Sequence, residues 1–225
     1  MPVFKKVNKN FFKKWSPDMA YVLGFFAADG YITVNKRGGQ FWCIQINDKI
    51  LLGEIKSVIK SNHKISVRLR RKKTENTSYR IQIGSIAMCN DLRKLGFSER
   101  KTKSLAIPNV PKKYFSDFVR GYFDGDGNVW SGLTHKESKS PSLTIQTVFT
   151  SCSLDFLEKL KDKLAIFGIS PGRIREKDGY YRLVYSINNS LKLYEFMYNG
   201  CSKDSIALLR KKQVFEKFKN LRLQL

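Results

Sequence analysis

Two copies of one short pattern lie 97 positions apart in this chain of 225 residues. The first copy, Ala20–Ile32, reads AYVLGFFAADGYI, and the second copy, Asp117–Val129, reads DFVRGYFDGDGNV. Each copy predicts a helix that ends at Asp-Gly and leads into a strand, because glycine can take the left-handed conformation that closes a helix. An internal repeat of this kind predicts a chain built from two similar units.

The residues after each copy predict the same series of elements. Alternating apolar and polar residues indicate strands, and apolar residues at helical spacing indicate helices. In the first half we expect strands at 31–34, 41–47, 65–70 and 78–83, with helices at 49–60 and 85–95. In the second half we expect strands at 128–133, 142–150, 172–175 and 180–187, a helix at 154–167, and further helices at the end. The predicted fold class is α+β, with two pseudo-symmetric αββαββα halves.

A short segment with two prolines separates the halves. Ile107–Lys112 reads IPNVPK, and prolines this close together interrupt regular structure. We therefore place the units at 1–112 and 113–225. The first carries a formal net charge of +16 and the second +7, so both are basic.

The charge of the whole chain indicates its class of partner. There are 42 Lys and Arg against 19 Asp and Glu, which gives a formal net charge of +23. Such a surplus attracts polyanions, because neutralised phosphates release condensed counterions. DNA, RNA and an acidic membrane surface are the candidates.

Secretion and membrane insertion are not expected. The longest apolar run, Ala20–Ala28, has nine residues, whereas a spanning helix needs about twenty. Lysines interrupt the apolar residues of Met1–Trp15, so this segment lacks the apolar core of a signal peptide. We expect an intracellular protein, in the cytoplasm or an organellar matrix.

The cysteines and histidines indicate no zinc site. Cys43, Cys89, Cys152 and Cys201 lie far apart in the sequence, and the chain has only two histidines. We expect reduced, structural thiols.

Small residues sit four positions apart in each repeated helix. Gly24 and Ala28 form one such pair, and Gly121 and Gly125 form the other. Helices that meet along small residues can bring their backbones close together. Asp29 and Asp126 would then converge at one end, where a divalent cation would relieve their repulsion. A single Asp-Gly indicates a helix stop, but two copies favour a metal site.

Asp124, two residues before Asp126, is expected to be structural or capping, because the two positions face different directions on a helix.

The repeated pattern, the αββαββα halves and the proline-bearing junction resemble the LAGLIDADG homing endonucleases in their single-chain, two-motif form. Val119–Gly127, VRGYFDGDG, follows the family pattern well, whereas Val22–Gly30, VLGFFAADG, has Ala27 where the family has its earlier Asp. The resemblance implies a saddle of two antiparallel sheets in the major groove of DNA, with the motif helices packed at the centre. It also implies that the later Asp of each copy, Asp29 and Asp126, binds metal. We include the backbone carbonyls of Ala28 and Gly125 in the predicted metal site.

One face of each predicted sheet is rich in Arg, Gln, Asn and Thr, side chains suited to phosphates and base edges. In the first half the predicted DNA-binding residues are Thr33, Asn35, Arg37, Gln45, Arg68, Arg70, Arg80 and Gln82. In the second half they are Asn128, Trp130, Ser142, Thr144, Gln146, Arg173, Arg175 and Arg182.

The resemblance also directs attention to basic residues near the end of each half. Arg100-Lys101 and Arg210-Lys211 lie 110 positions apart. We predict Lys101 and Lys211 as catalytic, with Lys103 and Lys212 as alternatives. Asn47, and secondarily Ser151, would hold the attacking water.

These observations predict a monomeric endonuclease that makes a double-strand break in a long, asymmetric DNA site. Mg²⁺ is the expected cofactor; Mn²⁺ would substitute, and Ca²⁺ would bind without supporting cleavage. The alternatives are an intron RNA maturase, a DNA-binding regulator that does not cut, and an excised intein endonuclease domain. The start at Met1 and the absence of flanking splicing blocks favour a free-standing protein over the intein domain.

Overall fold

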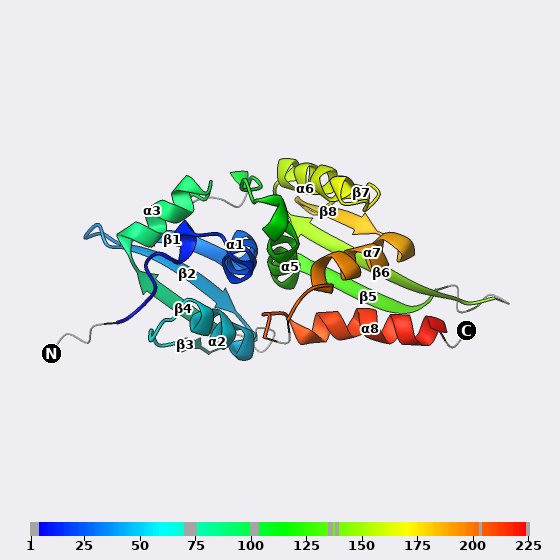
Figure 1. The fold of residues 1–225 in the computed structure, drawn as a ribbon, viewed down its shortest axis with the longest axis horizontal. Helices are drawn as coiled ribbons and strands as arrows, with labels where there is room; N and C mark the ends of the chain where they lie inside the picture. The colour runs from blue at the N-terminus through cyan, green and yellow to red at the C-terminus, as the bar shows by residue number, and fades with distance from the viewer. Residues whose placement is uncertain are drawn as a thin grey trace.

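Two halves lie side by side in the computed structural model, with their repeated helices in contact between them (Figure 1). The structure describes residues 5–69, 76–99, 104–134, 137, 140–202 and 204–223. Within these ranges no helix is both long and apolar enough to cross a membrane.

The first half follows the predicted order of elements. They are η1 (Phe11–Lys13), α1 (Pro17–Asp29), β1 (Gly30–Val34), β2 (Gln40–Ile46), α2 (Lys49–Val58), β3 (Ser66–Arg68), β4 (Ser78–Gly84) and α3 (Ile86–Lys94). The strands form one antiparallel sheet in the order β1-β2-β4-β3. Strand β3 is shorter than the 65–70 that the alternation predicts.

The second half repeats this order and continues after α7 into a further helix, α8. Its elements are η2 (Lys112–Tyr114), α5 (Phe115–Asp126), β5 (Gly127–Thr134), β6 (Ser142–Ser151), α6 (Leu154–Ile166), β7 (Arg173–Lys177), β8 (Tyr180–Tyr185), α7 (Ile187–Tyr198) and α8 (Leu209–Leu223). The sheet order is β5-β6-β8-β7, the counterpart of the first. The predicted α+β class and the two-repeat architecture are therefore confirmed.

Short polar side chains begin several helices at equivalent places. Asp48 accepts a hydrogen bond from the Leu51 N–H at the start of α2, and Ser153 accepts one from the Phe156 N–H at the start of α6. Such caps satisfy backbone donors that have no partner inside the helix. Each cap lies between the second strand of its half and the helix that follows, so it marks the residue at which that helix begins.

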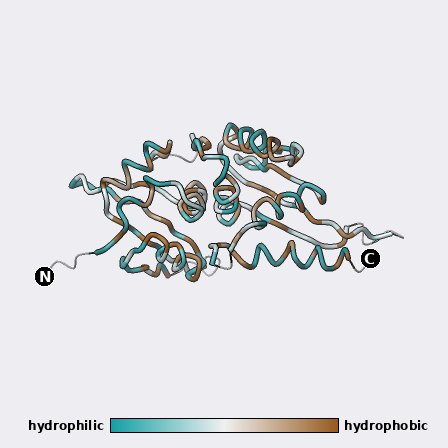
Figure 2. The backbone as a smooth tube through the Cα atoms, in the orientation of Figure 1, coloured by the Kyte–Doolittle hydropathy of each residue, from teal (hydrophilic) through white to brown (hydrophobic). Residues whose placement is uncertain are grey.

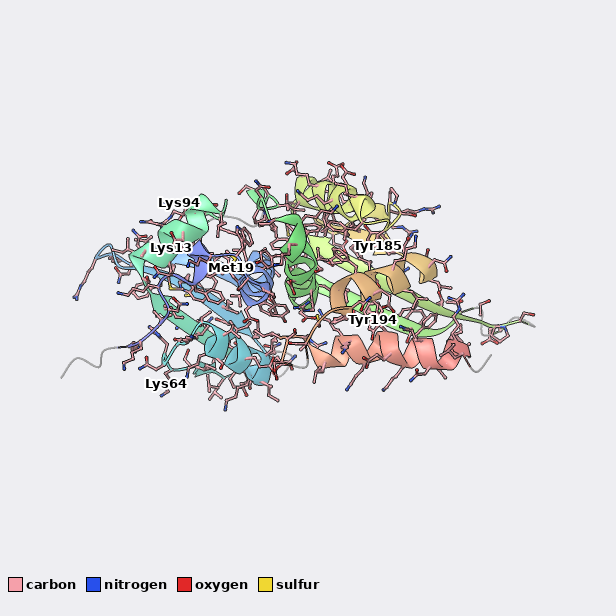
Figure 3. The ribbon with its side chains drawn as sticks, in the orientation of Figure 1. Lys13, Met19, Lys64, Lys94, Tyr185 and Tyr194 are labelled. Atoms are coloured by element: carbon pink, nitrogen blue, oxygen red, sulfur yellow. The ribbon has the colours of Figure 1, made fainter. Side chains whose placement is uncertain are left out.

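The N-terminal segment is attached to the first half through its aromatic residues. Phe12 is buried and its ring lies edge-on to Trp42 at a centroid distance of 5.5 Å. The Asn8 N–H donates to the Ile59 carbonyl at 3.1 Å. Figure 3 shows Lys64 and Lys94 at opposite margins of this half.

Helices α1 and α5 pack backbone against backbone. A Cβ added to Gly24 would lie 2.0 Å from the Phe118 carbonyl oxygen, and one added to Gly121 would lie 2.0 Å from the Tyr21 carbonyl oxygen. Only glycine fits at either position. Hydrophobic colouring marks α1 strongly in Figure 2, consistent with nine consecutive buried residues from Met19 to Ala27.

The glycines that follow the two helices differ from the sequence-based expectation. Gly30 has φ −88° and ψ 158°, and Gly127 has φ −90° and ψ 161°, which is extended rather than left-handed backbone. The reason for glycine is steric, because an added Cβ would lie 2.0 Å from the Phe26 ring at Gly30 and 2.2 Å from the Phe123 ring at Gly127.

Replacing Gly121 by alanine tests the helix contact. We expect Gly121→Ala to lower the free energy of unfolding by about 3 kcal/mol, because the new methyl group overlaps backbone that cannot move aside. Urea denaturation provides the measurement. Gly53→Ala in α2 is the matched control, since an added Cβ there meets nothing within 4 Å and alanine favours the helix by about 0.5–1 kcal/mol. Equal stability of the two variants would contradict the packing described.

Candidate metal site and nucleic-acid interface

The acidic ends of α1 and α5 meet. A Cβ added to Gly125 would lie 2.4 Å from the Ala28 Cβ and 3.0 Å from Asp29 Oδ2. Asp29 therefore lies against the last turn of α5, one residue from Asp126. Burial raises the pKa of Tyr122, and the charges of Asp126 and Asp29 both add to that rise, which places both carboxylates near one phenol.

A cleft of about 240 Å³ opens beside Asp29. Its lining includes Gln45, Asn47, Gly125 and Arg210. The structure thus brings together Asp29 and Asn47, two predicted catalytic residues, with Gln45 of the predicted DNA-binding face. Arg210 was not among the predicted site residues. The repeated pairs Arg100-Lys101 and Arg210-Lys211 were the signal that could have identified it.

The donors at this place suit a hard divalent cation. Two carboxylates and nearby helix-end carbonyls offer oxygen ligands only, the chemistry preferred by Mg²⁺ and Ca²⁺. Among the described residues no group of three or more His, Cys, Asp or Glu side chains could form a metal cage. A metal held here would therefore depend on Asp29 and Asp126 together with backbone, water or phosphate oxygens.

Lys211 is buried beneath this site. Its Nζ donates to the carbonyls of Phe123 at 2.7 Å, Asp124 at 2.9 Å and Gly127 at 2.5 Å. Burial lowers its pKa to about 8, partly offset by the nearby Asp124 carboxylate. The ammonium thus holds the C-terminal end of α5, where helix carbonyls lack partners. A catalytic role for Lys211 stays a prediction.

Of the other lysines predicted to be catalytic, Lys212 alone lies among the described residues. Lys212 lies 3.6 Å from Glu216 and 5.8 Å from the centre of the Tyr198 ring, so it faces α7 and its own helix. Lys101, Lys103 and Arg70 lie outside the described residues.

Asp124 has the structural role that its position on the helix favours. Its side chain is buried, and Oδ2 accepts hydrogen bonds from the Tyr21 hydroxyl at 2.7 Å and the Leu208 N–H at 2.8 Å. Burial raises its pKa, opposed by these hydrogen bonds. Asp124 therefore ties α1, α5 and the segment before α8 together.

Strand register places the polar residues of the first sheet on one face. Gln45 is opposite Arg80, and Arg68 is opposite Ser78, so these side chains share a face with Thr33 and Gln82. Tyr31, Phe41 and Cys43 lie on this face too, although the sequence did not indicate them.

Asn35 and Arg37 belong to the hairpin turn rather than to the strands. The Asn35 Oδ1 accepts hydrogen bonds from the N–H groups of Arg37 and Gly39. That oxygen organises the turn, while the Arg37 side chain is exposed at the tip.

The second sheet carries all eight of its predicted DNA-binding residues on one face. Trp130 is opposite Gln146, and Arg175 is opposite Arg182. The other four are related to these by the same register: Asn128, Ser142, Thr144 and Arg173. Lys177 and Thr150 share the face and were missed.

Ser151 does not occupy the place predicted for it. Gly30 is opposite Ile44, and Gly127 is opposite Phe149, so the counterpart of Asn47 is Cys152 and not Ser151. Ser151 is buried on the core side, where its Oγ accepts from the Ser153 N–H at 3.0 Å. It cannot hold a water at the cleft.

Comparison with known proteins agrees with this geometry. The model of the LAGLIDADG-like domain matches residues 16–95 and again residues 116–199. The chain belongs to the LAGLIDADG family. The two LAGLIDADG matches coincide with the two structural halves.

Solved LAGLIDADG structures share the fold. The meganuclease I-AabMI bound to uncleaved DNA superposes with a TM-score of 0.59 at 18% identity, covering 92% of this chain and 90% of that one. The I-SmaMI homing endonuclease bound to cleaved DNA gives 0.60 at 15% identity, covering 93% and 89%.

Two archaeal sequences are similar along the chain. A probable translation initiation factor IF-2 of Thermococcus kodakarensis is 34% identical over 165 residues, which is 65% of this chain but only 13% of that protein. The uncharacterized protein MJ0398 of Methanocaldococcus jannaschii is 25% identical over 217 residues, 90% of this chain and 71% of that one.

The buried Lys211 predicts a pH dependence of stability. A lysine whose pKa falls on folding binds fewer protons in the folded state, so its contribution to stability rises with pH between about 8 and 10.5. From pH 8 to pH 10 we expect the free energy of unfolding of the wild type to rise by about 2 kcal/mol relative to Lys211→Met. Urea denaturation of both proteins at the two pH values measures this difference. Parallel pH profiles would show that the ammonium is not buried as described.

Proposed function

We propose that this protein is a site-specific endonuclease that hydrolyses both strands of a long, asymmetric double-stranded DNA site with the help of a divalent metal. The observation that carries the proposal is the meeting of Asp29 with the end of α5 beside a cleft that also contains Asn47 and Arg210. The polar faces of the two sheets supply the surface for DNA. In I-SmaMI this fold has been solved with cleaved DNA.

Asp29 and Asp126 would hold the metal together with the carbonyls of Ala28 and Gly125. When bound, Mg²⁺ supplies charge stabilisation at the phosphate and lowers the pKa of a water nucleophile. Asn47 offers an amide that can orient that water, and the Arg210 guanidinium offers hydrogen bonds to phosphate oxygens. Lys211 holds the end of α5, so that Asp126 keeps its position relative to Asp29.

Both halves of the site belong to one chain, which supports action as a monomer. The two sheets place different side chains at equivalent positions: Thr33 corresponds to Trp130, and Gln45 corresponds to Thr150. A symmetric dimer would favour a palindrome, whereas unequal sheets favour two different half-sites. The net charge of +23 supports binding to duplex DNA with a steep salt dependence.

Replacing either motif aspartate tests the metal assignment. We expect Asp29→Asn and Asp126→Asn each to slow cleavage roughly a thousandfold or more, because the metal's stabilisation of the transition state is lost. DNA binding in Ca²⁺ should change little; I-SmaMI has been solved with uncleaved DNA in the presence of calcium ions. The substrate comes from an in vitro cleavage selection on randomised duplex DNA with Mg²⁺.

Asp48→Asn is the matched control for these variants. Asp48 lines the same cleft but caps α2, a task that asparagine performs equally well. It should cut at close to the wild-type rate. Full activity of Asp29→Asn would refute the metal assignment, and equal losses in all three variants would indicate a nonspecific effect of charge.

A further inference from the structure

A hollow of about 210 Å³ lies on the polar face of the second sheet. It is lined by Gln146, Arg175, Glu176, Lys177, Arg182 and Val184. We call it the arginine hollow. It is built from β6, β7 and β8, away from the cleft beside Asp29.

The described part of the protein does not neutralise the cations of the arginine hollow. Arg175 and Arg182 are directly opposite each other on neighbouring strands, an arrangement of like charges that destabilises a sheet. Across the described chain, no ion pair involves Arg175, Lys177 or Arg182. Glu176 borders the hollow, but it is opposite Tyr181 and alternates to the other face of the sheet, and none of the ion pairs among the described residues involves it. The two arginines are therefore available to an acceptor from outside the protein.

Among its described residues, the first sheet has no such pair of arginines. Ser66 occupies the place of Arg175, because it is opposite Arg80 as Arg175 is opposite Arg182. The Ser66 hydroxyl donates to the Arg80 carbonyl at 3.1 Å. One arginine on the first sheet thus corresponds to a pair on the second at this place.

The mixture of groups in the hollow fits a base edge. Guanine presents two acceptors, O6 and N7, in the major groove, and the fork of an arginine binds them together. These donors also suit a phosphate, but the hollow lies on the polar face of the sheet, which the proposed placement turns toward the base edges of the major groove. We propose that the arginine hollow recognises a guanine in the half-site contacted by the second sheet, through Arg175 and Arg182. This inference depends on the proposed placement of the sheet in the major groove.

Binding selection tests the inference without requiring cleavage. Full-length wild type, Arg175→Ser and Arg173→Ser are each incubated with a randomised duplex library in Ca²⁺, and the bound DNA is sequenced. Arg175→Ser introduces the side chain that the first sheet has at this place. Arg173→Ser is the matched control, because Arg173 lies on the same strand and face but outside the lining of the hollow.

The wild type should select a fixed guanine that Arg175→Ser no longer requires. We expect the preference at that position to fall about tenfold or more, the discrimination that one good bidentate contact supplies. Arg173→Ser should weaken binding to all sequences and reduce the salt dependence while keeping the guanine. Arg175→Ser should melt at the same or a higher temperature than the wild type, because a repulsion has been removed.

Other results would overturn the inference. If Arg175→Ser lowers affinity uniformly and loosens no position, the hollow binds a backbone phosphate. If the wild type selects no guanine in either half-site, or no sequence at all, the hollow does not recognise this base. Cleavage of the selected site in Mg²⁺ is scored separately: selection of guanine without cutting would refute the proposed nuclease and leave the inference standing.

Discussion

The close approach of α1 and α5 is the constraint on which the rest of the structure depends. Glycine at positions 24 and 121 lets the two backbones touch, and the same approach carries Asp29 to the end of α5. Buried side-chain contacts also hold α1 and α5 in place. The Tyr21 hydroxyl bonds to Asp124 across the interface, and Arg120 reaches the carbonyls of Met197 and Ile206 while pairing with Asp117. The position of the acidic site is therefore set by backbone packing rather than by flexible side chains.

The repeat preserves this packing while the exposed sheet faces diverge. Both halves have the same strand order and the same cap at the start of the helix that follows the second strand. Their polar faces nevertheless differ at equivalent positions, as with Ser66 and Arg175. Core positions must fill a fixed volume, whereas the faces toward solvent or DNA have no such restriction.

Much of this structure could be predicted from the sequence, because its determinants are periodic. Alternation gave the strands and their faces, and the repeat identified Asp29 and Asp126. Errors arose where the outcome depended on strand ends or on side-chain contacts that local sequence patterns do not describe. Strand β6 extends to Ser151 whereas β2 ends at Ile46, so matching the strand ends paired Asn47 with Ser151 in place of Cys152. The side-chain environment of Lys211 could not be inferred from a run of basic residues, because two of its acceptors come from α5 and the third from Gly127 at the start of β5. The need for glycine at position 30 comes from the ring of Phe26, which local rules for Asp-Gly do not include.

The contacts that α8 and the segment before it make with α7 and α5 can form only late in the synthesis of the chain. Tyr194, labelled in Figure 3, donates from α7 to Glu216 of α8 at 3.3 Å, and Phe215 is buried below it. Through Leu208 and Lys211 this region provides partners for Asp124 and for the end of α5, 84 to 88 residues earlier in the chain. During synthesis from the N-terminus, the acidic helix ends are made long before the groups that hold them. A nascent chain therefore carries both motif aspartates without the support that fixes their geometry. The partners of the end of α5 are available only after residues 208–211 have been synthesised.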